Sequence, residues 1–517
     1  MAGRSHSSAW FRLALLGCSS ALAACTVSPS ALEPDRLAVI AADKIGRLDQ
    51  GQAPITGTVD LYEAMARALR YNLDHQVELA EQALRQRELD LAHYSLLPSV
   101  VAGSGYAARD KVLASSSQNV ETGVESLATS TSQDRRLRTS DIVLSWNVLD
   151  FGLSYVRARQ AADKVLIQRE LRRKIALRIL EDVRAAYWRA VSAQELLGRI
   201  GHVTDLARGA EAEARKQFSD RETSAITALT YERELVEIQR TLGELRRELD
   251  TALIQLGTLM NVKPGTRFRV SAHRRGVPPP PAGHMAELIH TAVMSRPELR
   301  EVEYRKRINE QEAHAALLEL LPGAHVLVGA NYDSNSFLLH DNWVNWGARA
   351  SWNLLKVFAY PARREVVEAQ DRLLDQRSLA VTMAIMTQVY VSRARYAGAL
   401  RDLKTASRYR EVQHSLLRQI REEAGAGRIA RQTLVREELN AIVADAKLDL
   451  AYAAAQGALA NLRTSIGVDP VDIDSVHETS IGALAAALRS GMPAAARPEP
   501  SKEAGAPQIQ KVADASK

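Results

Sequence analysis

The sequence predicts an α+β membrane protein in which long helices continue a small antiparallel sheet, with the same plan in each half of the chain. Three observations support this prediction. The stretch SWNVLDFG, which begins at Ser145, returns as SWNLLKVF, so that Trp146 and Trp352 lie 206 positions apart (352 − 146). Proline is absent from 99–263 and from 362–469, where the longest helical patterns lie. Strand-like segments alternate apolar and polar residues.

Residues 1–24 are predicted to form a secretory signal peptide. Arg4 and Arg12 precede the apolar run LALLGCSSALAA, which is too short to cross a membrane as a helix. The run ends in LAAC, which resembles the processing motif of bacterial lipoproteins and predicts that Cys25 carries lipid, with palmitate among the acyl chains. Ordinary signal cleavage near Ala24 is the alternative. If Cys25 carries lipid, residues 25–58 form a lipid-anchored N-terminal segment.

Composition argues against several classes of function. The chain has 67 basic and 61 acidic side chains, which gives a formal net charge of +6. These charges are mixed along the chain, and no basic run is interleaved with aromatic residues, so nucleic-acid binding is not predicted. Cys18 leaves with the signal peptide, so the mature chain would keep one cysteine and would form neither a disulfide nor a cysteine metal site. The twelve histidines are scattered, and no metal site is predicted.

The first repeat, 59–265, is expected to contain a helix, two strands and a helical hairpin. We place them at 59–96, at 99–107 and 140–150, and at 152–261, the hairpin consisting of helices 152–217 and 223–261. A helix of about 65 residues is ~100 Å long and needs a helical neighbour along its length. The two shorter helices, stacked end to end, could supply that neighbour.

The second repeat, 284–470, follows the same order. We place its helix at 284–320, its strands at 324–333 and 343–355, and its hairpin at 359–466. Between the repeats, 266–283 contains RRGVPPPPAG and is expected to be a proline-rich connector. Residues 471–517 are expected to form a short equatorial segment, with a helix at about 481–489, and a disordered tail.

The strands suggest a transmembrane barrel. In 343–355, Val344, Trp346 and Trp352 alternate with polar residues, and we expect the polar set to face a lumen: Asn345, Arg349 and Asn353. A half-buried sheet in water has the same periodicity and is the alternative. Four of the six tryptophans lie in the predicted strands, as expected for interface aromatics, although core packing is also possible: Trp146, Trp343, Trp346 and Trp352.

Four strands cannot close a barrel with a usable lumen, so several copies of the chain would have to share one. Three copies would supply twelve strands, an even number that leaves a lumen open to water. Beyond the signal peptide, no stretch has the 18 consecutive apolar residues of a spanning helix, so a membrane crossing would use strands.

The lipoprotein motif and the duplicated order of LLP, strand, loop, strand, WN(V/L)L and long helix resemble the TolC family of outer-membrane efflux proteins, in its lipoprotein branch. The resemblance extends over about 59–470. It implies a homotrimer with a 12-stranded outer-membrane barrel, which a long periplasmic α-helical coiled-coil barrel continues. It also implies an exit duct that works with a periplasmic adaptor protein and an inner-membrane RND or ABC transporter. No cofactor and no enzymatic activity are implied.

The resemblance further implies that the two hairpin turns form a periplasmic tip where the adaptor docks. The candidate tip residues are Asp220, Arg221, Glu222, Thr223, Gly425, Gly427, Arg428 and Thr433. The family usually has a turn glycine, which Gly427 matches, and a nearby acid that constricts the pore. Ala228 and Thr433 stand where that acid is expected, so the sequence departs from an acidic gate. Solvated turn charges are the alternative role for the tip acids.

No catalytic motif competes with this interpretation. GAGRIA, at 425–430, matches a dinucleotide fingerprint by spacing, but it follows a helix rather than a strand and therefore lacks the phosphate-binding geometry. The sequence does not identify the cargo. Small-molecule or drug efflux is favoured because lipidation is more usual among the drug-efflux members of the family, and type I protein secretion is the alternative. A periplasmic helical scaffold lipoprotein without a barrel is a third possibility.

Overall fold

The computed structural model describes residues 30–48, 50–126, 128–220, 224–271, 283–468, 474, 476 and 479–490. The predicted signal peptide, Cys25 and three of the tip candidates (Arg221, Glu222 and Thr223) lie outside them, as do most of the proline-rich connector and the tail from 491. The chain divides into two units, Met1–Pro54 and Ile55–Lys517.

In the first unit, α2 (Pro34–Arg47) is an exposed helix. Pro34 stands at its start, where the missing backbone N–H would have no helical partner. Asp35 in the first turn and Arg47 in the last turn complement the helix dipole. Local signals of this kind account for the position of the helix.

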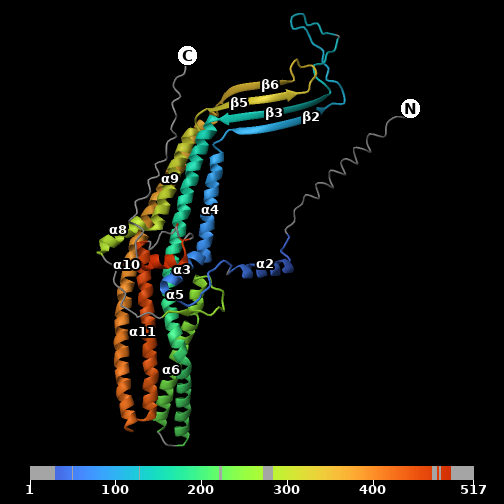
Figure 1. The fold of residues 1–517 in the computed structure, drawn as a ribbon. Helices are drawn as coiled ribbons and strands as arrows, with labels where there is room; N and C mark the ends of the chain where they lie inside the picture. The colour runs from blue at the N-terminus through green and yellow to red at the C-terminus, as the bar shows by residue number, and fades with distance from the viewer. Residues whose placement is uncertain are drawn as a thin grey trace, which may run out of the picture. The chain divides into compact units, whose positions relative to one another are not determined.

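In the second unit, long helices extend from a four-stranded sheet to two turns at their far end (Figure 1). The strands of this sheet are β2 (Ser99–Ala108), β3 (Arg136–Asn147), β5 (Gly323–Asp333) and β6 (Asn342–Ser351). The helices before, between and after them are α3 (Leu61–Tyr71), α4 (Leu73–Tyr94), α5 (Val148–Ser219), α6 (Ala225–Asp250), α7 (Ala252–Leu259), α8 (Met285–Ser295), α9 (Pro297–Leu318), α10 (Leu355–Gly425), α11 (Arg431–Ile466) and α12 (Ile481–Ser490).

The helices predicted as continuous at 59–96 and 284–320 are each broken once, so those predictions were wrong. Asn72 leaves the helical region with φ −59° and ψ 128°, and its side chain accepts from the backbone N–H of Asp74 at 3.0 Å. Arg296 has nearly the same conformation, φ −70° and ψ 131°, because Pro297 keeps the residue before it out of the helical region. The predicted helix 223–261 is likewise interrupted, at Thr251.

The long helices exceed their predicted lengths. At 72 and 71 residues, α5 and α10 each extend over ~105 Å at the usual helical rise. As expected, each packs against two partners in succession: α5 against α4 and then α6, and α10 against α9 and then α11. Contacts between α5 and α11 join the two hairpins near the middle of the unit.

An asparagine lies at each junction between a strand and a long helix, from β3 to α5 and from β6 to α10. The side chain of Asn147 accepts from the backbone N–H of Leu149 at 3.1 Å, and that of Asn353 accepts from Leu355 at 3.2 Å. A side-chain oxygen that accepts from a free N–H group of the first turn favours a helix start close to that point. The strands predicted at 140–150 and 343–355 therefore end earlier than expected, at Asn147 and at Ser351.

The largest core cluster lies midway along the helices, where α3, α5, α7, α11 and α12 meet. The rings of Trp188 and Tyr452 pack edge to face with their centroids 4.9 Å apart. The buried hydroxyl of Tyr187 donates toward the carbonyl of Ser271 at 2.8 Å, beside the short parallel pair of β1 (Thr58–Val59) and β4 (Arg269–Val270). Burial raises the pKa of this tyrosine. Aromatic burial here holds the connecting segments against the long helices.

In each repeat, one residue with a left-handed backbone follows the last helix of the hairpin. Gly467 follows α11 with φ 74°, and its N–H donates to Arg463 and Thr464. Asn261, 206 positions earlier, has φ 56° and donates its N–H to Thr258. Glycine and asparagine are the residues that adopt this conformation at least cost, so both chain reversals follow from local chemistry.

Candidate functional site: the exposed sheet and the helical tip

The sheet is fully antiparallel in the order β2-β3-β5-β6. Paired residues of such a sheet project to the same side, and the pairs Ala102–Ile142, Ile142–Ala330 and Ala330–Val344 join residues of even number. The regular register therefore places even-numbered residues of all four strands on one side, the even face. Odd-numbered residues share the other side, the odd face.

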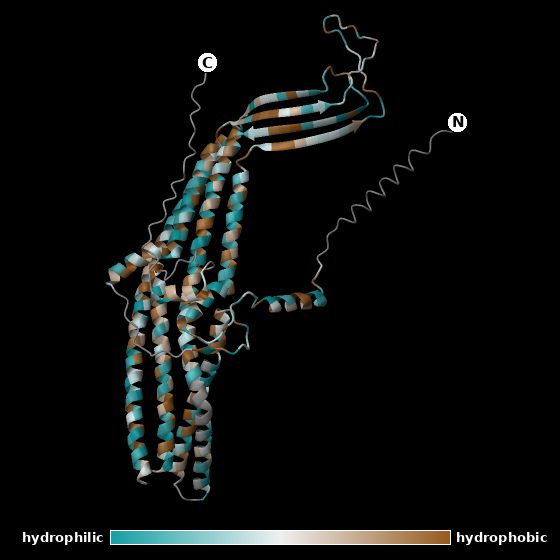
Figure 2. Ribbon diagram, viewed as in Figure 1, coloured by the Kyte–Doolittle hydropathy of each residue, from teal (hydrophilic) through white to brown (hydrophobic). Residues whose placement is uncertain are grey.

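The even face is apolar and exposed. The exposed fractions of its large side chains run from 40% at Leu144 to 84% at Trp346. The set comprises Val100, Ile142, Leu144, Trp146, Val326, Val328, Val344 and Trp346. Figure 2 shows apolar residues among the polar ones along these strands. A continuous exposed apolar surface of this extent marks an interaction surface, since water is a poor solvent for it.

The odd face carries most of the polar strand side chains, together with Val101, Val143 and Leu327. Ser99 and Ser145 face each other with their hydroxyl oxygens 2.6 Å apart. The side-chain amide of Asn331 donates to that of Asn345 at 2.7 Å, and the amide of Asn147 lies 3.0 Å from the ring nitrogen Nε2 of His325. Hydrogen bonds therefore join neighbouring strands along the polar side.

Of the three predicted lumen residues, two lie on the odd face and one lies outside the sheet. Asn345 and Arg349 project from β6 on the odd face, where Arg349 is opposite His325. Asn353 lies beyond β6, just before the start of α10, and its side-chain oxygen accepts from the N–H of Leu355, so its placement in a barrel strand was wrong. Its side-chain oxygen serves the helix start, for which Asn is a common residue.

The four predicted interface tryptophans do not share one face. Trp146 and Trp346 lie on the even face, and the ring of Trp146 packs edge to face on Phe151 with centroids 5.8 Å apart. Trp352 follows the last residue of β6, and its indole N–H donates to the carbonyl of Leu320 at 2.8 Å. Trp343 is odd-numbered and lies opposite Asn331, on the polar side. The sequence prediction grouped it with the others because it counted aromatics without regard to the period of two.

The second hairpin turn is closed by Gly427, which has φ 72°, a conformation that other residues adopt at a cost. Its N–H donates to Ala424 at 3.0 Å, and the guanidinium of Arg428 lies 3.1 Å from the carboxylate of Glu423. Gly425 is the last residue of α10, and Thr433 lies in the first turn of α11. The sequence identified this turn glycine correctly.

The first turn begins at Asp220, whose N–H donates to the carbonyl of Lys216 at 2.9 Å. The helix that follows this turn, α6, begins after Ser224, whose hydroxyl accepts from the N–H of Thr227 at 3.2 Å. Ser224 was not among the predicted tip residues, although a serine before a helical run is a recognisable start signal.

Equivalent ion pairs brace the two hairpins above their turns. The guanidinium of Arg215 in α5 lies 2.9 Å from the carboxylate of Glu232 in α6. In α10 and α11, the pair Arg421–Glu438 has the same separation of 2.9 Å. Both residues of the second pair lie 206 positions after those of the first. Each pair joins the two antiparallel helices of one hairpin, so it favours their side-by-side packing.

Two contacts join one hairpin to the other near the tip. The hydroxyl of Tyr231 in α6 donates to the carbonyl of Gln432 in α11 at 3.1 Å, and burial raises the pKa of Tyr231 to about 12. The guanidinium of Arg436 lies 3.1 Å from the carboxylate of Glu234. Leu235 of α6 belongs to the same buried apolar cluster as Val435, Leu439 and Val443 of α11. The tip is therefore one packed body in this structure.

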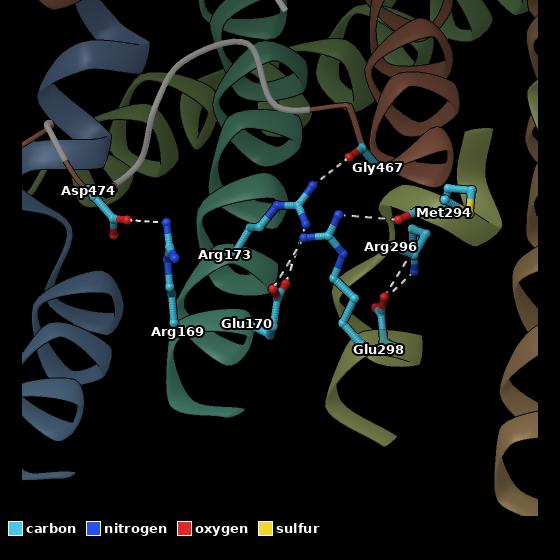
Figure 3. Close-up of polar contacts among 9 residues, drawn as sticks. Arg169, Glu170, Arg173, Met294, Arg296, Glu298, Gly467 and Asp474 are labelled. Atoms are coloured by element: carbon cyan, nitrogen blue, oxygen red, sulfur yellow. Dashed lines mark hydrogen bonds and ion pairs between the residues drawn. The ribbon is translucent and has the colours of Figure 1, made fainter. Parts of the chain in front are cut away.

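A cluster of arginines holds the end of α11 against α5 and α9, away from the tip (Figure 3). The guanidinium of Arg296 is bound to both oxygens of Glu298 at 2.9 Å and donates to the carbonyl of Thr464 at 3.0 Å. Arg173 donates to the carbonyl of Gly467 at 3.0 Å. Cations at a helix C-terminus satisfy its free carbonyls and complement its dipole. Arg169, in α5, pairs with Asp474 in the segment that follows.

Sequence reasoning missed this cluster because its members are distant in the chain and no motif links them. Within the described ranges, no group of three or more His, Cys, Asp or Glu residues is arranged to hold a metal ion. None of the described helices is both long enough and apolar enough to span a membrane.

An exposed, two-faced sheet continued by paired helices of this length defines the fold of the TolC-like outer-membrane channels. Three solved structures with this fold are the open-state MtrE outer membrane channel of Neisseria gonorrhoeae, the CmeC outer membrane channel of Campylobacter jejuni and the outer membrane protein VceC of Vibrio cholerae. MtrE is 15% identical over 79% of this chain and 88% of its own, with a TM-score of 0.60.

CmeC is 10% identical over 91% of this chain and 98% of its own, with a TM-score of 0.61. VceC is 12% identical over 79% of this chain and 96% of its own, with a TM-score of 0.56. No family model and no curated protein sequence matches the chain. The resemblance predicted from the sequence is therefore confirmed at the level of the fold.

Proposed function

We propose that three copies of this chain form an outer-membrane exit duct, with a 12-stranded barrel and a periplasmic helical tunnel. The observation that carries the proposal is the exposed apolar even face, backed by a hydrogen-bonded polar odd face. Lipid on one side and a water-filled lumen on the other would satisfy both faces. A duct of this kind does no covalent chemistry.

The edges of the sheet favour closure between copies. β2 and β6 have no strand partner beyond the sheet among the described residues, so each offers a row of free backbone groups. Pairing β2 of one copy with β6 of the next would bond these groups, as lipid requires. Three such seams would close twelve strands, and the duplicated plan of the chain would give six similar strand pairs around the barrel.

Aromatic residues on the even face fit two membrane interfaces. Trp146 lies near the helical end, opposite Val326, while Tyr332 and Tyr106 lie near the loop end. Val326 and Tyr332 are six residues apart, so they are separated by ~20 Å along β5. This separation approaches the height of the apolar band between the aromatic girdles of outer-membrane barrels.

In this proposal the two turns form the periplasmic end of the duct, where an adaptor protein would dock and an inner-membrane transporter would supply cargo. Candidate contacts are Asp220, Gly425, Gly427, Arg428 and Thr433, together with Arg221, Glu222 and Thr223. Opening would require the hairpins to separate. Cys25, if lipidated, would anchor the chain in the inner leaflet of the outer membrane.

For the cargo we favour small molecules exported by an RND or ABC transporter. The lipoprotein motif is the feature that favours this choice over type I protein secretion. A strain that lacks this chain tests which cargo is exported. Loss of resistance to dyes or detergents with intact protein secretion supports efflux. Loss of protein secretion with intact resistance supports type I secretion.

The duct itself is tested by extraction and cross-linking. A trimer that requires detergent and dissociates on heating supports the proposal. An elongated monomer released by salt contradicts it and favours a periplasmic scaffold. Since Cys25 is the mature chain's one cysteine, cysteines introduced along the outer edges of β2 and β6 can be oxidised selectively. Covalent dimers and trimers should form only when each copy carries one cysteine on β2 and one on β6. Cysteine pairs placed on β3 and β5, which are neighbours within one copy, serve as the matched control.

A further inference from the structure

Trp343 is an aromatic side chain on the polar face of the sheet. It lies in β6 opposite Asn331 of β5, which in turn lies opposite Asp141 of β3. All three are odd-numbered and share one row across the strands. Trp346, three residues later, lies on the opposite face. If the even face meets lipid, Trp343 projects into the lumen.

The same row contains an acid, Asp141, two strands away from Trp343. The carboxylate of Asp141 has no hydrogen-bond or ion-pair partner among the described residues, whereas Asn331 is engaged by Asn345 at 2.7 Å. A Cβ at Gly103 would lie 2.6 Å from Oδ1 of Asp141, so the carboxylate occupies the space that this glycine leaves. Strand spacing places the Cα atoms of Asp141 and Trp343 ~10 Å apart.

Charge is distributed unevenly along the odd face. The acids Asp141 and Asp333 lie toward the loop end, while His325 and Arg349 lie opposite each other toward the helical end. Trp343 is on the acidic side, six residues from Arg349, which is ~20 Å along the strand. The carboxylate of Asp333 accepts from the backbone N–H of Asn335 at 3.0 Å, so Asp141 is the acid of this side that is left without a partner among the described residues. A ring face and a carboxylate on the same face of the sheet can together attract a cation that also has an apolar part.

On these grounds we infer that Trp343 and Asp141 form a luminal subsite for organic cations in the outer half of the barrel. The inference rests on the proposed function, because it needs the odd face to line a lumen. In a trimer the subsite would occur three times. An aromatic cation would stack on the indole ring and place its charge toward the carboxylate.

The first experiment locates the two indoles. Full-length trimers carrying Trp343→Phe or Trp346→Phe are reconstituted into vesicles of brominated or ordinary phosphatidylcholine. Fluorescence quenching by the brominated lipid should fall in Trp346→Phe and stay unchanged in Trp343→Phe. Quenching by acrylamide in the water phase should show the opposite pattern. Equal loss of lipid quenching in both variants overturns the inference and leaves the barrel in place. No lipid quenching of Trp346 contradicts the barrel itself.

The second experiment tests the ligand class with tetraphenylphosphonium as the probe. Added on the loop side of a planar bilayer, it should block the channel current, and Trp343→Ala or Asp141→Asn should each weaken the block about threefold or more, as a lost cation–π or charge contact predicts. Trp346→Ala is the matched control. The uncharged triphenylphosphine oxide should respond to Trp343→Ala but not to Asp141→Asn. Block that is unchanged in both variants overturns the subsite.

Discussion

The guanidinium of Arg436 in α11 lies 3.1 Å from the carboxylate of Glu234 in α6, which joins hairpins more than 200 residues apart in the sequence. Both side chains are about one-third exposed. Beside them, Tyr231 donates to Gln432. In the proposed duct, separating the hairpins at the tip would break both contacts.

Glu234→Gln should weaken this contact without disturbing the pair that Arg436 also forms with Glu437. An exposed ion pair contributes ~0.2–1 kcal/mol, so the open probability should rise by up to about fivefold. Single-channel recording measures it. Glu244→Gln is the control, because Glu244 pairs with Arg240 inside the same helix. Equal effects of the two changes would show that the inter-hairpin pair does not restrain the tip.

Gly467→Ala should destabilise the protein. Its φ of 74° costs a residue with a Cβ about 1–2 kcal/mol, and the new Cβ would lie 3.0 Å from Cδ of Arg296, displacing the arginine from the end of α11. Denaturant unfolding in detergent measures the change. Gly482→Ala, where nothing lies within 4 Å, is the matched control and should be neutral or slightly stabilising. A neutral Gly467→Ala would count against the cap.

Asn261→Gly should increase the free energy of unfolding, whereas Gly467→Ala should lower it. Asn261 occupies the corresponding left-handed position with φ 56°, and glycine removes the remaining strain of its Cβ. We expect stabilisation of a few tenths to 1 kcal/mol by the same assay. Loss of stability would mean that the Asn261 side chain contributes more than its backbone conformation suggests.

The Asp445 site should make stability pH-dependent. Burial raises the pKa of its carboxyl, but hydrogen bonds from His414 at 2.9 Å and Arg410 at 2.6 Å, with their charges, lower it overall. A lowered folded-state pKa stabilises above the ordinary pKa and loses that effect as pH falls through the folded value.

Asp445→Asn should therefore cost about 1–2 kcal/mol at pH 7, and the difference from wild type should shrink below about pH 4. Thermal unfolding between pH 7 and pH 3 measures it. Asp250→Asn, an exposed acid paired within α6, is the control and should change little. A deficit that stays constant down to pH 3 would rule out ionisation of Asp445 as its source.

Several elements were predictable because their signals are local. Alternation along the strands indicated the sheet, and the absence of proline over long stretches indicated α5 and α10. The turn glycine, Gly427, was recognised through the family resemblance, which places a glycine in this turn. Pro297 and Asn72 carried equally local signals for the two helix breaks, and their neglect explains why 59–96 and 284–320 were each predicted as one helix.

The site was predictable only in part. Asn345 and Arg349 followed from the period of two, which holds wherever a strand is regular. Trp343 was grouped with tryptophans of the opposite face, and Asn353 was placed in a strand that ends at Ser351. Strand register and strand end depend on hydrogen bonds to other segments, which the sequence pattern does not show. The arginines around Gly467 have no pattern in the sequence, since their partners are carbonyls and acids brought together by packing.

By itself, the sequence determined the order of the helices and strands, the alternation of the sheet faces and the left-handed turns, because each depends on residues close together in the chain. Only the tertiary structure decided which strands pair, which face Trp343 occupies and which arginine reaches the end of α11. Those relationships join residues up to about 300 positions apart, and the free energy that selects them arises when the helices pack and the strands pair.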